Sequence, residues 1–193
     1  MVKHFPEICS LLDPNITKWD DPTERYFNGK IVKGRPTRGF GEAEFNYAGR
    51  VYKPEPWSKE ILDIKQAAEN IAYLTLHKQI EFNFCLCGYY SERGEGIPHH
   101  SDTVPTEDDV VVSISFGDTR VFEWIEYSKK IKSSTNTSEI DVRYKDKKDT
   151  RLYLLKHGDV LIFDGKSQLT STHAIPDVIG GKERINITFR SGI

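Results

Sequence analysis

The stretch that decides the fold is Arg184-Ile185-Asn186-Ile187-Thr188-Phe189-Arg190. Polar and apolar residues alternate along it, and a period of two is typical of a β-strand with one buried face. Its apolar face would pack into a core, while the opposite face carries two arginines. A buried guanidinium without a partner is costly, and its planar fork suits a carboxylate. The stretch therefore predicts a strand whose polar face meets an anion, such as a small dicarboxylate that chelates a metal through its other end.

The residues most suited to hold a metal lie in a second run, Pro98-His99-His100-Ser101-Asp102. In an extended segment residues two apart share a face, so His100 and Asp102 project together and His99 turns away. A histidine beside a carboxylate is two-thirds of the two-His-one-carboxylate site that binds Fe(II). Two histidines follow: His157, beside a predicted turn, and His173, in a strand-like run. Taken alone, His173 is also typical of an ordinary, partly buried strand histidine.

Hydrophobic periodicity elsewhere predicts one helix and several short strands. Apolar residues recur at three- and four-residue steps after Ser58, a good N-cap, and predict an amphipathic helix to about Gln79. Asn28-Gly29 between strand-like flanks predicts a hairpin, and residues 34–42 look rich in turns. The other predicted strands, each bounded by Gly, Pro, Asp or charge, are 81–90, 110–116, 119–127, 151–155, 159–163 and 171–175. One helix followed by such strands favours a helix packed on a β-sandwich or open barrel.

Composition bounds the class of protein. The 193 residues are 37% hydrophobic and 29% charged, a globular composition long enough to bury a core and unlike that of a disordered chain. No apolar run approaches the roughly 20 residues that cross a bilayer, and the N-terminus lacks the apolar region of a secretory signal. Three cysteines cannot form a disulfide framework. We therefore expect an intracellular protein of the cytoplasm or nucleus, a monomer without membrane contact.

The charge distribution allows only a local contact with nucleic acid. The formal net charge is −2, so no overall basic field points to a nucleic-acid partner. From Lys129 to Arg151, however, eight basic residues stand against four acidic ones, a local excess of +4. This segment is either a solvated loop or a flap that contacts phosphates.

Taken together, three elements resemble the AlkB family of Fe(II)- and 2-oxoglutarate-dependent dioxygenases. They are His100-x-Asp102, His173 about 70 residues later, and Arg184-x-Asn186-x-Thr188-x-Arg190. Neighbouring stretches extend the resemblance from about residue 27 to residue 190. The resemblance implies an α+β fold, a double-stranded β-helix (jelly-roll) core with a supporting N-terminal helix and a nucleotide-lid extension. It also implies one domain over residues 1–193, of which 1–55 are the extension and lid, 56–80 the helix, and 81–193 the core with a basic insertion at 129–150.

The resemblance assigns the catalytic centre. His100, Asp102 and His173 would hold Fe(II), and 2-oxoglutarate and O₂ would be the co-substrates. Arg184 would pair with the distal carboxylate of 2-oxoglutarate, with Arg190 near its keto-acid end. The resemblance also implies that Asn186 supports this contact and that Tyr90 hydrogen-bonds the co-substrate.

The resemblance also assigns a substrate side. Phe40 aligns with an element of the nucleotide lid, and Phe45 and Tyr47 follow it, so their rings would stack on a flipped base. Core packing is an equal alternative for Phe45 and Tyr47. The hairpin around Asn28-Gly29 resembles the wedge of DNA-repair members, although an ordinary surface hairpin fits it as well.

Two positions depart from the family pattern. Gly88 stands where an asparagine usually accompanies the tyrosine, so one hydrogen bond to 2-oxoglutarate is missing, an effect on the order of 1 kcal/mol. Val104 stands at the substrate-binding position where repair members carry an acidic residue that reads the damaged base. Its apolar side chain favours a different base, a different polar reader or a substrate other than nucleic acid.

The function that the resemblance favours is oxidative demethylation of N-alkylated bases in DNA or RNA. A second hypothesis is a 2-oxoglutarate oxygenase that hydroxylates a protein, a small molecule, or an unmodified or C-methylated base. A third is a relative without catalytic activity that binds nucleic acid or protein. The third is disfavoured because a binding module has no need of the three iron ligands and both arginines together.

Overall fold

The computed structural model describes residues 19, 24–27, 30–47, 50–102, 106, 108–128 and 147–191. Its first strands are β1 (Glu24–Phe27), β2 (Lys30–Lys33), β3 (Thr37–Gly41), β4 (Phe45–Tyr47) and β5 (Arg50–Tyr52). Helix α2 (Lys59–Leu76) follows, and then β6 (Phe84–Tyr90), β7 (Ile97–His100), β8 (Val110–Gly117) and β9 (Arg120–Tyr127). The last elements are β10 (Lys147–Leu155), β11 (Val160–Asp164), the short 3-10 helix η2 (Lys166–Leu169), β12 (Ser171–Ile175) and β13 (Arg184–Arg190).

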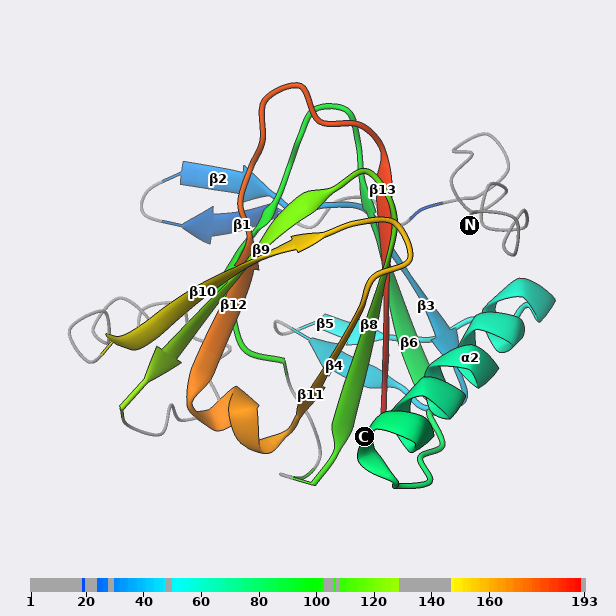
Figure 1. Ribbon diagram of the computed structural model, residues 1–193. Coiled ribbons are helices and arrows are strands. Elements are labelled where there is room, and N and C mark those ends of the chain that lie inside the picture. The colour runs from blue at the N-terminus through cyan, green and yellow to red at the C-terminus, as the bar shows by residue number, and fades with distance from the viewer. Residues whose placement is uncertain are drawn as a thin grey trace.

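The strands form two principal sheets that face each other (Figure 1). The larger sheet has the order β11-β8-β13-β6-β3, and the smaller has the order β10-β9-β12-β7. Their neighbouring strands pair antiparallel, and β1-β2 and β4-β5 form two separate hairpins. Helix α2 lies on the outer side of the larger sheet (Figure 1). Antiparallel sheets with one α-helix in the described part agree with the β-sandwich that the sequence pattern favours and with the jelly-roll core that the resemblance implies.

Helix α2 confirms the helix predicted from residue 58. The Ser58 hydroxyl accepts a hydrogen bond from the Ile61 N–H (3.3 Å), which caps the first turn. At the other end His77 takes a left-handed conformation (φ 54°) and its N–H donates to the Tyr73 carbonyl, so the helix ends three residues before the predicted limit. The buried face presents Ile61, Ile64, Ala68 and Ala72 to the larger sheet.

Along the central strands β6, β8 and β13, successive side chains point to opposite faces of the larger sheet. One face packs against the helix, and the other faces the space between the sheets. On β13, Ile185, Ile187 and Phe189 are buried in the cluster that includes the helix. The residues between them face the smaller sheet. The second apolar cluster lies between the sheets and consists of Phe84, Leu86, Tyr90, Ile97, Phe122, Leu155 and Ile175. Strand β13 therefore has one apolar face and one polar face, as predicted.

Two predicted boundaries were wrong. Residues 34–42, expected to be turns, contain β3, which pairs with β6. The glycines of β3 permit this approach, because a Cβ on Gly39 would lie 3.1 Å from the Phe84 ring. Strand β10 begins at Lys147, so residues 147–150 of the predicted basic insertion belong to a strand. The rest of that insertion lies outside the described residues.

Two other features bear on the predictions. The register of β1 and β2 pairs Phe27 with Lys30, which confirms the hairpin, while Asn28 and Gly29 lie outside the described residues. Among the described residues, no helix combines the length and the apolar character needed to cross a membrane.

The packing of α2 makes a direct prediction. Ile64 is 1% exposed and contacts the larger sheet, whereas Leu74 on the same helix is 72% exposed. We expect Ile64→Ala to lower the free energy of unfolding by about 2–5 kcal/mol, because it removes buried apolar surface and leaves a cavity. Leu74→Ala, the matched control, should change it by less than about 0.5 kcal/mol. Chemical denaturation measures both, and equal effects would contradict the packing described.

Candidate active site

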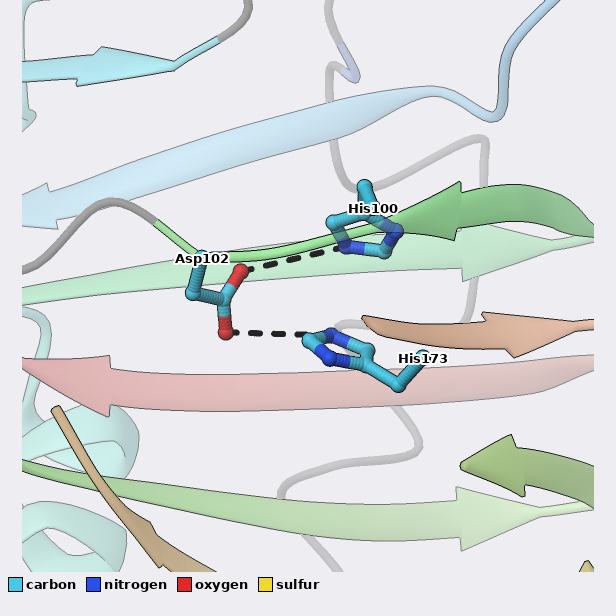
Figure 2. Close-up of side chains that lie close together, drawn as sticks. All are labelled: His100, Asp102 and His173. Carbon is cyan, nitrogen blue, oxygen red and sulfur yellow. Dashed lines mark ion pairs between the residues drawn. The ribbon is translucent and has the colours of Figure 1, made fainter. Parts of the chain in front are cut away.

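The register of two strands brings the predicted metal ligands together. β12 pairs antiparallel with β7 so that His173 lies opposite His100, and the two ring centroids are 4.3 Å apart. Asp102 follows β7 by two residues and projects to the same face as His100. Each histidine presents Nε2 to one carboxylate oxygen of Asp102, at 3.8 Å from His100 and 3.9 Å from His173 (Figure 2). The three side chains converge, although His173 is 73 positions from His100.

Neighbouring hydrogen bonds hold the chain beyond β7 beside β12. The Asp102 N–H donates to Oε1 of Gln168 (2.9 Å), a buried side chain of η2. The Ser101 hydroxyl donates to the Ser171 carbonyl (2.8 Å). These contacts hold the backbone of Ser101 and Asp102 beside β12 and η2. Sequence reasoning missed Gln168 because its role depends on how η2 folds back.

The protonation of the three residues suits a divalent cation. His100 Nδ1 lies 2.9 Å from the Pro98 carbonyl, which can only accept, so Nδ1 carries the proton and Nε2 is left as the ligand atom. Burial lowers the pKa of His100 well below its usual value, with a further contribution from His173. Burial also lowers the pKa of His173. Burial raises the pKa of Asp102, but Arg190 and the two histidines outweigh it and bring that pKa to about 2.

The donor set fits ferrous iron. His100, Asp102 and His173 each offer one ligand atom, and the three atoms lie within 4.8 Å of one another. Two neutral imidazoles and one ionised carboxylate form the facial set that binds Fe(II) and leaves positions open for other ligands. Among the described residues these three form the group that qualifies as a metal site.

The polar face of β13 lines the same pocket as the three ligands. Nη1 of Arg190 lies 3.2 Å from Oδ1 of Asp102, so this arginine holds the carboxylate. Asn186 donates to the Ser113 hydroxyl (2.8 Å) and the Ile114 carbonyl (3.0 Å), and accepts from Thr188. The Asn186 amide is therefore bonded within the sheet and supports the pocket floor.

Arg184 is the cation best placed to receive an anion. Its side chain is 1% exposed, its guanidinium carbon lies 4.7 Å from the centroid of the Tyr90 ring, and Nη2 donates to Ser115 (2.9 Å). Within the described part of the chain, Nε and Nη1 of Arg184 have no hydrogen-bond partner. Burial lowers the pKa of Arg184, so its surroundings disfavour the charge. A buried guanidinium with unused donors is suited to a carboxylate ligand.

Of the other predicted residues, the structure places Tyr90 in the pocket and Phe40 outside it. Phe40 lies opposite Cys85 on β6, so its ring is 3% exposed in the helix-side core and not in the pocket. Phe45 and Tyr47 belong to β4, but their side chains lie outside the described part, as does Val104. Tyr90, the last residue of β6, lines the pocket together with the metal ligands.

The remaining histidines of the motifs have other partners. His99 turns away from the metal ligands, as predicted, and contacts Thr172 and Glu123. His157 accepts a hydrogen bond from the Gly117 N–H (3.0 Å) at the turn before β11, which confirms its expected place in a loop.

Comparison with known proteins agrees with this geometry. Residues 23–190 match the family model described as the 2OG-Fe(II) oxygenase superfamily. The chain is 32% identical to alpha-ketoglutarate-dependent dioxygenase alkB homolog 3 of Bos taurus, over 81% of this chain and 51% of the relative. It is 30% identical to the Homo sapiens protein of the same name, with the same coverage. A third relative is the DNA oxidative demethylase ALKBH2 of Arabidopsis thaliana, 27% identical over 93% of this chain and 59% of the relative.

The chain spans about half the length of the alkB homolog 3 proteins that it matches. Its own match to the family model nevertheless includes every residue of the pocket described above. The converging His100, Asp102 and His173, and the arginines beside them, are thus part of the matched region. The chain belongs to the 2OG-Fe(II) oxygenase superfamily and is an AlkB-type member of it.

Proposed function

We propose that this chain is an Fe(II)- and 2-oxoglutarate-dependent dioxygenase that oxidatively demethylates N-alkylated bases in DNA or RNA. The observation that carries the proposal is the convergence of His100, Asp102 and His173 in one pocket with the buried Arg184. The family implies bound Fe(II) and 2-oxoglutarate. The two histidines and the carboxylate fit the iron, and the unused guanidinium donors of Arg184 fit a carboxylate of 2-oxoglutarate.

The residues of the chain would divide the work as follows. His100, Asp102 and His173 hold the iron, and Arg190 keeps the Asp102 carboxylate in place. The free donors of Arg184 receive the distal carboxylate of 2-oxoglutarate beside the Tyr90 ring. When bound, ferrous iron supplies the activation of O₂ that couples decarboxylation of 2-oxoglutarate to hydroxylation of a C–H bond. On a hydroxylated N-methyl group the C–N bond would then break, so that the hydroxyl group loses its proton, the base nitrogen keeps the electron pair and the carbon leaves as formaldehyde.

The choice of a nucleic-acid substrate rests on relatives and on the periphery of the pocket. The Arabidopsis relative is named a DNA oxidative demethylase. The two hairpins before α2 belong to the segment that we propose as a nucleotide lid, with Phe45 and Tyr47 as its substrate contacts. We propose Val104, which follows the metal ligand Asp102, as a further substrate contact, while Phe40 belongs to the helix-side core. We further propose that residues 1–193 act as one domain, monomeric and intracellular. The free buried cysteines, Cys85 and Cys87, agree with a reducing setting.

The test combines binding with turnover. Mn(II) together with 2-oxoglutarate should raise the melting temperature, because a ligand at 100 times its Kd stabilises the native state by about 2.7 kcal/mol. With Fe(II), 2-oxoglutarate and O₂, oligonucleotides that carry 1-methyladenine or 3-methylcytosine should release formaldehyde, and unmodified oligonucleotides should not. Succinate production without formaldehyde from any modified strand would reject demethylation and favour hydroxylation of another substrate. No stabilisation and no succinate would reject the oxygenase itself.

A further inference from the structure

Gly88 leaves space on the pocket side of the larger sheet, and an arginine fills it. Gly88 lies on β6, opposite Asn186 of β13, at the position where the amide side chain of the family pattern is missing. A Cβ added to Gly88 would lie 2.2 Å from Nε of Arg35 and 3.1 Å from its Cδ. The Arg35 side chain therefore crosses directly over the backbone of Gly88. Any residue other than glycine would place its Cβ in the space that the Arg35 side chain occupies.

The backbone before β3 fixes where Arg35 begins. The Tyr89 N–H donates to the Pro36 carbonyl (2.9 Å), so the segment that carries Arg35 runs along β6. From there the guanidinium carbon of Arg35 reaches 5.1 Å from the centroid of the Tyr90 ring. Arg184 contacts the same ring at 4.7 Å, and both arginines line the pocket of the metal ligands. The two guanidinium groups thus lie against one ring at one end of the pocket.

Guanidinium groups are concentrated in the pocket, where Arg35, Arg184 and Arg190 all line the wall. Arg190 contacts Asp102, whereas Arg35 and Arg184 both lie at the Tyr90 ring. Two guanidinium groups at one ring suit a carboxylate group, and 2-oxoglutarate offers one at its distal end.

We infer that Arg35 is a binding residue for 2-oxoglutarate, admitted by Gly88 and acting beside Arg184; this inference rests on the proposed function. Its guanidinium takes the place of the missing amide and donates to the distal end of the co-substrate. A charge-assisted hydrogen bond to a carboxylate is stronger than one from a neutral amide. Gly88 therefore does not weaken co-substrate binding, contrary to the expectation from sequence, since it exchanges an amide donor for a cation.

The test is a calorimetric titration of 2-oxoglutarate into the full chain loaded with Mn(II). We expect Arg35→Met to raise the Kd for 2-oxoglutarate about 10- to 100-fold, the loss of a hydrogen bond to a charged group, with the Kd for Mn(II) unchanged. Gly88→Ala should raise it similarly, because the new Cβ displaces the Arg35 side chain without replacing its donors. In Arg35→Met/Gly88→Asn the amide occupies the vacated space, and part of the lost affinity should return.

The control is Arg38→Met. Arg38 lies on the other face of β3, over the Phe40 ring and bonded to Glu55, and its loss should leave 2-oxoglutarate affinity unchanged. If both Arg35→Met and Gly88→Ala bind 2-oxoglutarate like the parent chain, the inference is wrong and the proposed function stands. If Arg35→Met weakens Mn(II) binding as much as 2-oxoglutarate binding, its role is structural and the inference is also wrong. If the parent chain itself does not bind 2-oxoglutarate with Mn(II), both the inference and the proposed function fail.

Discussion

His173→Ala should weaken Mn(II) binding by more than about 100-fold and reduce 2-oxoglutarate-dependent succinate formation at least as much. Removing even an outer partner of a metal ligand typically costs 10- to 100-fold in affinity or activity, so removing a ligand itself should exceed that range. Among the described residues, no other His, Cys, Asp or Glu joins His100 and Asp102 in this group, so none can replace His173. Calorimetric titration with Mn(II) and a succinate assay measure the two effects.

A matched histidine separates ligand loss from a general disturbance. His157 is exposed, lies in a turn and accepts a hydrogen bond from Gly117, so His157→Ala should leave Mn(II) affinity unchanged. His173 also packs against Phe122 and Trp124, and its loss will disturb that cluster. His100→Ala provides a second variant at a more exposed ring and should lose Mn(II) binding equally. Retention of full Mn(II) affinity in either ligand variant would contradict the site.

Arg184→Met should stabilise the ligand-free protein and abolish the stabilisation by 2-oxoglutarate. The ligand-free protein buries a guanidinium whose Nε and Nη1 lack hydrogen-bond partners in the described part of the chain. Replacing a poorly satisfied buried charge by an apolar side chain of similar length is often stabilising, here by about 1–3 kcal/mol. The same change removes the partner of the distal carboxylate, so the Kd for 2-oxoglutarate should rise by at least about 100-fold. Denaturation with and without 2-oxoglutarate and Mn(II) measures both.

Arg120→Met is the control, because Arg120 is about as buried as Arg184 but its guanidinium is paired with a carboxylate. Its guanidinium pairs with Asp118 and donates to the Lys182 carbonyl (2.7 Å). Its loss should destabilise the ligand-free protein by about 1–3 kcal/mol and leave 2-oxoglutarate affinity unchanged. A destabilised Arg184→Met that still binds 2-oxoglutarate would reverse the expected pattern and show that Arg184 serves the core only.

Local sequence patterns were sufficient to predict those features of the fold that depend on a single helix or strand. The alternation in 184–190 predicted both faces of β13, and the three- and four-residue steps after Ser58 predicted α2. The spacing of His100 and Asp102 predicted a shared face, which the structure shows. These predictions hold because side-chain direction follows from the period of the backbone.

Features that depend on a neighbouring element were not predictable in the same way. Residues 37–41 form a strand only because β6 offers an edge to pair with, and two glycines hide the strand pattern. The register of that pairing turns Phe40 toward the helix, which no pattern within 34–42 reveals. Gln168 and Arg35 reach the site across tertiary contacts, and each looks like an ordinary polar residue in its own segment.

The most direct test of the account is a crystal structure of the chain with Mn(II) and 2-oxoglutarate, prepared without oxygen, with the metal located by its anomalous scattering. The account predicts a single strong anomalous peak within bonding distance of His100 Nε2, His173 Nε2 and an Asp102 oxygen. It also predicts the distal carboxylate of 2-oxoglutarate against the Arg184 guanidinium. A metal bound elsewhere, or a co-substrate whose distal carboxylate lies away from Arg184, would contradict it.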